Sequence, residues 1–172
     1  MIIEVCVESI RGIKAAQKFK LERIEVCGDL YNDGLTPEID FQKKAKKYFS
    51  NDRYIMIRPH YRSFIYNETD IKVMKKSILI ASKFNPKGVV FGSLNKSNQI
   101  DLRTNEILIS YAKNLNLKCT FHRAFDICNN PFKSFNIIKS MGFDCLLTSG
   151  HQKDAEKGIQ ILKKLTELKK DK

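Results

Sequence analysis

The sequence contains no long apolar run and no recognisable targeting segment. None of its 172 residues falls in a stretch approaching the ~18 consecutive apolar residues of a membrane-spanning helix. The first residues, MIIEVCVESI, lack the basic region and the cleavage site of a signal peptide. We therefore expect a cytoplasmic protein without a membrane partner.

The five cysteines lack the pairing typical of a disulfide framework or a zinc site. They stand at positions 6, 27, 119, 128 and 145, an odd number with no Cys-x-x-Cys pair. Cys119 and Cys145 fall in strand-like runs, where we expect them to pack as small hydrophobic residues. Cys128 falls in a loop, where we expect an exposed thiol.

Acidic residues are few beside the basic ones, and the formal net charge is +12. Clustered lysines and arginines can bind phosphates, which raises nucleic acid as a partner. The lysines gather in helix-like segments such as QKKAKKYF, however, and no helix-turn-helix, zinc finger or RNP motif accompanies them. We interpret the charge as solvated helix faces, which does not favour a nucleic-acid partner.

Short apolar strands alternate with helix-like segments along the chain. The strands are predicted at 2–8, 23–29, 54–60, 88–94, 118–125 and 144–150. The helices are predicted at 10–20, 40–49, 70–83, 104–115, 132–141 and 153–170. This alternation predicts an α/β fold with a parallel sheet and right-handed crossovers.

An open doubly wound sheet and a (β/α)8 barrel both fit this spacing, and two features favour the barrel. The first is that no GxGxxG or GxxxxGK(S/T) motif follows the first strand, so the usual phosphate cradle of an open sheet is missing. The second is that polar residues occupy one face of several strands, as Glu4, Cys6 and Glu8 do in the first. Because helices cover the outside of a barrel, this polar face should point inward.

The same alternation places Glu25, Arg58 and His122 on the inward side. They would converge near the C-terminal ends of the strands, where barrel enzymes carry out their chemistry. The alternative interpretation is a buried structural network of ion pairs.

The sequence resembles the CutC family, whose members are often described as copper homeostasis proteins. The matching segments are, in chain order, EVCVES, RIEVCGDL, GLTP, IRP, GVVFGSL, TFHRAFD and LTSG. The resemblance covers residues 1–172 as a single domain and implies a TIM-barrel-like fold. The sequence departs from the family pattern at RPHYRSF, which contains His60, and at His151, where a second glycine is expected. We expect both histidines to be surface loop residues.

Only six of the eight β-α units that the resemblance implies are present in the sequence. A complete barrel usually has about 200–250 residues, so we expect either part of a longer protein or a natural truncation. The first and sixth strands would then carry unpaired backbone groups, which invite association. We therefore expect self-association into a homo-oligomer.

A copper site is the first of two functional hypotheses. Cys6 and Cys27 each end a Glu-x-Cys triplet, and their strands should be neighbours, about 4.8 Å apart. Two thiolates at that range suit Cu(I), a soft ion. The resemblance also implies copper binding through cysteines at these positions. The alternative is that both thiols only pack in the core.

The second hypothesis is a barrel enzyme of unknown reaction that acts on a small anionic metabolite. Glu25 would donate or accept protons, Arg58 would bind the anionic group, and His122 would carry a proton. Asp126 would join them, or would only begin the turn in DICNNP. Arg123 has the opposite parity, which favours an outward ion pair. Whether the protein is an enzyme stays open.

Overall fold

Six parallel strands form a single sheet that curls into part of a barrel. The computed structural model describes residues 2–170. The strands pair in the order β1-β2-β3-β4-β5-β6, and each neighbouring pair is parallel. They are β1 (Glu4–Val7), β2 (Arg23–Val26), β3 (Asp52–Met56), β4 (Gly88–Phe91), β5 (Lys118–Phe121) and β6 (Cys145–Leu146).

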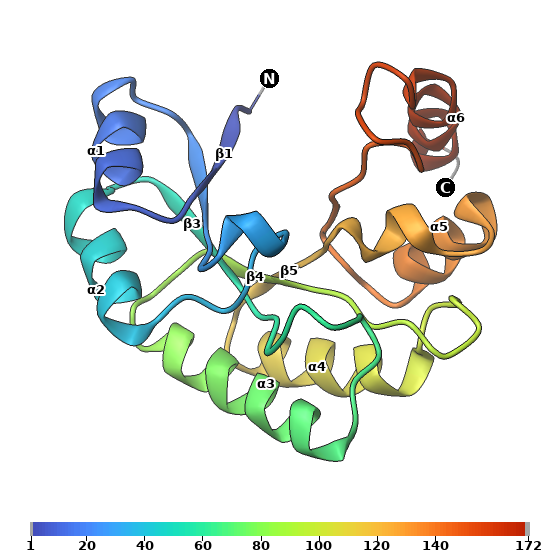
Figure 1. Ribbon diagram of the computed structural model, residues 1–172, viewed down its shortest axis with the longest axis horizontal. Coiled ribbons are helices and arrows are strands. Elements are labelled where there is room, and N and C mark those ends of the chain that lie inside the picture. Colours follow the sequence, from blue (N-terminus) through green and yellow to red (C-terminus); the bar gives the residue numbers. More distant parts are fainter. Residues whose placement is uncertain (1, 171–172) are drawn as a thin grey trace.

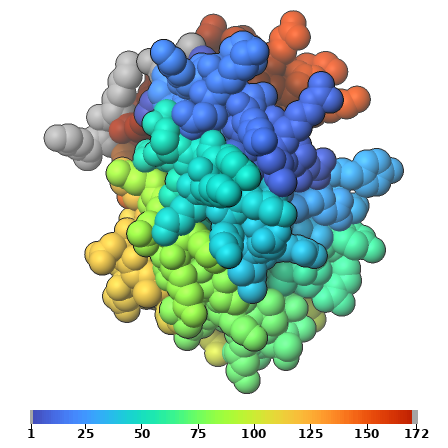
Figure 2. Space-filling view, turned by 90° about the vertical axis from the view of Figure 1, so that its left-hand side faces the viewer, coloured from blue at the N-terminus to red at the C-terminus, as the bar shows by residue number. Residues whose placement is uncertain are grey.

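A helix follows each strand and lies on the outer side of the sheet (Figure 1). Figure 2 shows α1, α2 and α3 side by side on one outer face. The predicted TIM-barrel-like α/β fold with six β-α units is thereby confirmed. The helices are α1 (Ile10–Lys18), α2 (Ile39–Tyr48), α3 (Glu68–Ser82), α4 (Leu102–Asn114), α5 (Pro131–Ser140) and α6 (Ile159–Lys170).

Side-chain caps fix where four of these helices begin. Ser9, Asn67, Asp101 and Asn130 precede α1, α3, α4 and α5, and each accepts a hydrogen bond from a backbone N–H of the first turn. These bonds satisfy N–H groups that have no partner within the helix. The caps therefore set the length of the loops that carry polar residues at the C-terminal ends of the strands.

The two faces of the strands pack in different hydrophobic clusters, as the alternation of polar and apolar residues predicts. Ile24 and Val26 of β2 pack with the helices on the outer side. Cys27 and Met56 belong to a smaller inner cluster with Tyr54 and Val90. Glu25, between the two outward residues of β2, is 1% exposed and lies on the inner side. The inward direction predicted for this polar face is confirmed in β2.

Two predictions about cysteines are wrong. Cys145 is exposed, because β6 is the last strand of the described sheet and has a partner on one side only. Cys128 is buried, because the 3₁₀ turn η2 (Arg123–Ile127) folds it back against Phe125 and Ile138. Cys119 is buried as predicted.

The largest boundary differences lie at the end of the chain. The strand predicted at 144–150 shortens to β6, and the helix predicted from residue 153 begins only at Ile159. Bends and turns occupy residues 150–158 of the stretch between them. Among residues 2–170, no helix is long and apolar enough to cross a membrane. Self-association through β1 and β6 stays a prediction.

Candidate functional site

Two cysteines and one glutamate of the first two β-α units meet on the inner side of the sheet. One ligand atom from each of Cys6, Glu25 and Cys27 lies within 4.8 Å of the others. The strand register pairs Cys6 with Glu25, so the two Glu-x-Cys triplets are shifted by two residues. Cys27 follows β2 and donates its N–H to the Val7 carbonyl at 2.9 Å. The two cysteines therefore approach each other diagonally across the strands.

Glu25 has an unusual environment for a carboxyl group. The Cys27 thiol donates a hydrogen bond to Glu25 Oε1 at 3.3 Å, whereas Oε2 is buried without a partner among the described residues. Burial raises the pKa of Glu25 to about 7, and the negative charge of Glu4 adds to that rise. The hydrogen bond from Cys27 opposes the rise but does not cancel it. Near neutral pH, Glu25 can therefore donate or accept a proton.

The thiol of Cys27 is protonated in the absence of a metal. Its hydrogen bond with Cys6 raises the pKa of Cys27, and burial and the charge of Glu25 act in the same direction. A cation must therefore displace a proton in order to bind this sulfur. Cys6 is exposed, so the cluster can be reached from solvent. The two sulfurs form a donor pair that fits a soft metal ion such as Cu(I), and the unpartnered carboxylate oxygen of Glu25 lies beside them.

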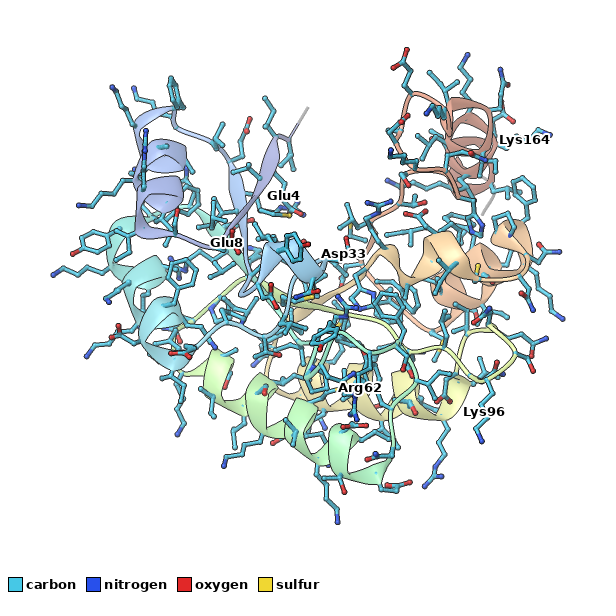
Figure 3. The ribbon with its side chains drawn as sticks, viewed as in Figure 1. Glu4, Glu8, Asp33, Arg62, Lys96 and Lys164 are labelled. Carbon is cyan, nitrogen blue, oxygen red and sulfur yellow. The ribbon has the colours of Figure 1, made fainter. Side chains whose placement is uncertain are left out.

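The cluster opens into a cavity of about 320 Å³. In Figure 3, Glu4 of β1 and Asp33 of the loop after β2 lie on the side that faces α5 and α6. The polar residues that line the cavity come from β1, from β2 and the loop after it, and from η2 and the residue before it. They are Cys6, Glu25, Cys27, Asp33, His122, Arg123 and Asp126.

His122 is buried and uncharged near neutral pH. Burial lowers the pKa of its imidazole to about 3, and the positive charge of Arg58 contributes. Its Nδ1 accepts a hydrogen bond from the N–H of Ala124 at 3.3 Å, which places the proton of the neutral ring on Nε2. Nε2 has no partner among the described residues. His122 can therefore donate a hydrogen bond but does not hold a positive charge.

The guanidinium of Arg58 forms hydrogen bonds with backbone carbonyls of two loops. Its Nη1 donates to the carbonyls of Asn32 and Gly34 at 2.8 and 3.2 Å, and its Nη2 donates to the Tyr61 carbonyl at 3.3 Å. The guanidinium also lies over the ring of Phe64, 4.5 Å from its centre. Only Nε lacks a partner in the described part of the chain. Arg58 could bind an anion through two hydrogen bonds only if its bonds to these carbonyls were broken. The geometry therefore favours a structural role for Arg58.

Asp126 joins η2 to the loop after β6. It accepts hydrogen bonds from the backbone N–H groups of Ser149 and His151 and from the hydroxyls of Thr148 and Ser149. Arg123 forms an ion pair with it at 2.9 Å, as expected for Arg123, but both residues line the cavity, so the outward position expected for this pair is wrong. Burial tends to raise the pKa of Asp126, but the hydrogen bonds outweigh burial and lower it. Asp126 is thus an ionised structural acceptor at the cavity rim.

Several residues near this end of the sheet were not identified correctly from the sequence. Asp33 and Phe64 line the cavity although neither is among the site residues expected from the sequence; Phe64 ends the RPHYRSF segment that departs from the family pattern. His60 and His151, expected as surface side chains, are partly buried: His60 lies 3.5 Å from the Asp70 carboxylate, and His151 contacts Cys128. The one signal for His151 is that it stands where the family pattern has a glycine.

Comparison with known proteins gives relatives along the whole length of this chain. A family protein CutC of Histophilus somni is 38% identical over 170 residues, which are 99% of this chain and 69% of that protein. A family protein CutC of Glaesserella parasuis is 34% identical over 165 residues, which are 96% of this chain and 67% of that protein. The chain thus spans about two thirds of the length of these relatives.

Solved structures give the same fold. A Streptococcus agalactiae protein that carries the name of a copper homeostasis protein CutC superposes with a TM-score of 0.89 at 28% identity, over 97% of this chain and 82% of that one. A xylose isomerase domain protein of Planctomyces limnophilus has a TM-score of 0.57 at 12% identity, over 95% of this chain and 70% of that one, which shows the fold alone. The sequence model of the CutC family matches residues 1–172. The chain therefore belongs to the CutC family.

Proposed function

We propose that this protein takes part in copper handling and binds Cu(I) between Cys6 and Cys27. The observation that carries the proposal is the approach of two thiols and the Glu25 carboxyl to within 4.8 Å on the inner side of the sheet. Thiolates select Cu(I) over harder cations, and Cu(I) accepts few ligands. Family membership and the name of the S. agalactiae protein support the same function. Binding would release the thiol protons and leave Glu25 beside the ion.

An anaerobic Cu(I) titration against a competing chelator tests this proposal. Cys128 and Cys145 are first replaced by serine, so that neither of these other thiols contributes. We expect one tightly held Cu(I) in this background and its loss in both Cys6→Ser and Cys27→Ser. Because the two sulfurs would share one ion, each single replacement should weaken binding nearly as much as the double replacement.

Cys119→Ala is the matched control, because Cys119 is buried on the outer side of the sheet, away from the cluster. It should change stability and leave the copper stoichiometry at one. Unaltered Cu(I) affinity in either Cys6→Ser or Cys27→Ser would show that the assignment is wrong.

A second candidate function is binding or conversion of a small polar metabolite in the same cavity. Two observations favour it: Glu25 Oε2 and His122 Nε2 are buried and have no partner within residues 2–170, and both residues line the cavity. Buried polar atoms without partners are rare in folded proteins and are often explained by an unseen ligand or water. This candidate needs a Glu25 carboxyl that exchanges its proton near neutral pH.

Glu25→Gln tests that requirement through the pH dependence of stability. The pKa of Glu25 is about 7 in the folded protein, above its ordinary value of 4.5. The stability that this carboxyl contributes is therefore fully present below pH 4.5 and is lost as pH rises through 7. We expect the metal-free protein to lose ~2–3 kcal/mol from this group between pH ~4.5 and ~8. Glu25→Gln should lack that loss in urea unfolding followed across this range. Parallel pH curves for the two proteins would contradict the raised pKa.

A further inference from the structure

A cysteine and a histidine form a close pair outside the cavity described above. Cys128 Sγ lies 3.4 Å from His151 Nε2. Cys128 follows η2 and His151 follows β6, so two separate loops at the same end of the sheet bring them together. Cys128 is 4% exposed, whereas His151 is only partly buried. Neither residue lines the cavity that holds Cys6 and Cys27.

The backbone of His151 is held in a conformation that few residues adopt. Its φ is +59°, in the left-handed region, where histidine, asparagine and aspartate occur more often than other residues with a side chain. Its N–H donates to Asp126 Oδ1 at 3.2 Å, and its ring meets the ring of Phe125 edge to face at 5.0 Å. The surrounding structure therefore fixes the direction of the imidazole toward Cys128.

The surroundings of Cys128 include groups that can stabilise a thiolate. Its sulfur interacts with the Ser134 hydroxyl and with the backbone N–H of Asn130, the cap of α5. Both favour the ionised thiol. Burial has a larger effect and raises the pKa of Cys128, so the free thiol is protonated. A metal ion that replaces the proton would find these donors already in place.

We propose that Cys128 and His151 bind a second Cu(I) ion, independently of Cys6 and Cys27. Thiolate sulfur is a soft ligand that selects Cu(I), and imidazole also suits copper. Typical metal–sulfur and metal–nitrogen bonds of ~2.3 and ~2.0 Å can bridge two atoms that lie 3.4 Å apart. In this step the S–H bond breaks, its proton leaves to solvent, and Cu(I) bonds to the sulfur and to Nε2 without change of oxidation state. The partly buried His151 gives the ion access to the sulfur.

The test uses a background in which Cys6, Cys27 and Cys145 are all serine. This removes the first proposed site and the exposed thiol of β6, so that its result does not depend on the first proposal. We expect anaerobic titration with Cu(I), in the presence of a competing chelator, to give one bound ion per chain. Adding Cys128→Ser or His151→Asn should each reduce the stoichiometry to zero.

His151→Asn is chosen because asparagine tolerates the left-handed backbone, so the melting temperature and circular dichroism should stay close to those of the background. His60→Asn is the matched control, since it removes a partly buried loop histidine at the same end of the sheet and should leave one ion bound. The proposal is overturned if the background binds no Cu(I), or if the ion stays in the folded His151→Asn variant. The titration of the Cys6–Cys27 site is a separate experiment. Its outcome affects neither the stoichiometry of this background nor that of the His151→Asn variant.

Discussion

Replacing Asp126 with alanine is expected to lower the free energy of unfolding by about 4 kcal/mol at pH 7. The carboxylate accepts hydrogen bonds from Thr148, Ser149 and His151, and its ion-pair partner Arg123 also donates to it. Its side chain is 7% exposed, so water cannot readily take its place as the acceptor of these hydrogen bonds. Leaving buried donors without acceptors costs ~1–3 kcal/mol each, reduced where the loop can relax toward water. Urea unfolding of both proteins measures the difference.

Asp154→Ala is the control for this variant. Asp154 is exposed, pairs with Lys157 at 3.6 Å and accepts a hydrogen bond from the Lys157 N–H at 2.9 Å, so its loss should change the free energy of unfolding by less than about 1 kcal/mol. A similar small effect for Asp126→Ala would contradict the structural role given to Asp126.

The difference between wild type and Asp126→Ala should also depend on pH in a defined direction. The folded pKa of Asp126 lies below its ordinary value of 3.8. The stability that the carboxylate contributes is therefore fully present above pH ~4 and is lost as pH falls through the folded pKa. The unfolding curves of the two proteins should converge under acid conditions.

Gly158→Ala is expected to lower the free energy of unfolding by a similar amount, about 4 kcal/mol. A Cβ atom at this position would lie 1.8 Å from the carbonyl oxygen of Ser149 and 3.0 Å from the Cα of Gly150. Both contacts are with backbone, so no side-chain rotation can relieve them. The start of α6 would have to move, which would weaken the packing of Leu165 in the core beside α5. Urea unfolding again gives the free energy, and proteolysis within 151–158 reports on the loop.

Gly12→Ala is the matched control for this glycine. A Cβ on Gly12 would meet side-chain atoms of Ser9 and Val7 at 3.4 Å, which is a close but tolerable contact. Since Gly12 lies within α1, the higher helix propensity of alanine should leave stability unchanged or raise it by up to ~1 kcal/mol. If Gly158→Ala and Gly12→Ala change the free energy of unfolding by similar amounts, the close backbone packing at the start of α6 is not important for stability.

The arrangement of the sheet could be predicted because it depends on patterns that the sequence carries directly. In β2, outward Ile24 and Val26 alternate with inward Glu25, and this alternation alone brings Glu25 to the inner side. The Glu-x-Cys triplets predicted that Cys6 and Cys27 would be close. Their diagonal approach could not be predicted, because the offset between β1 and β2 is set by packing of the intervening helix and loops.

The roles of the polar loop residues could not be predicted, because they depend on partners far away in the sequence. Arg58 bonds to loop carbonyls such as that of Gly34, and carbonyls leave no trace in a sequence motif. Asp126 depends on the fold of residues 148–151. The exposure expected for Cys128 is wrong because η2 is a 3₁₀ turn without a periodic pattern, and the burial of Cys128 follows from the way that turn packs.

Because β1 is an end strand, a metal ion at the Cys6 cluster would affect how firmly the edge of the sheet is held. β1 is the end strand of the described sheet and pairs only with β2, whereas β2 is held on both sides. An ion shared by Cys6 and Cys27 would cross-link the outermost strand to an inner one through bonds much stronger than the hydrogen bonds between the strands. Bound copper would therefore hold this edge strand against the sheet, so that β1 would fray less and its edge would be less available to other chains.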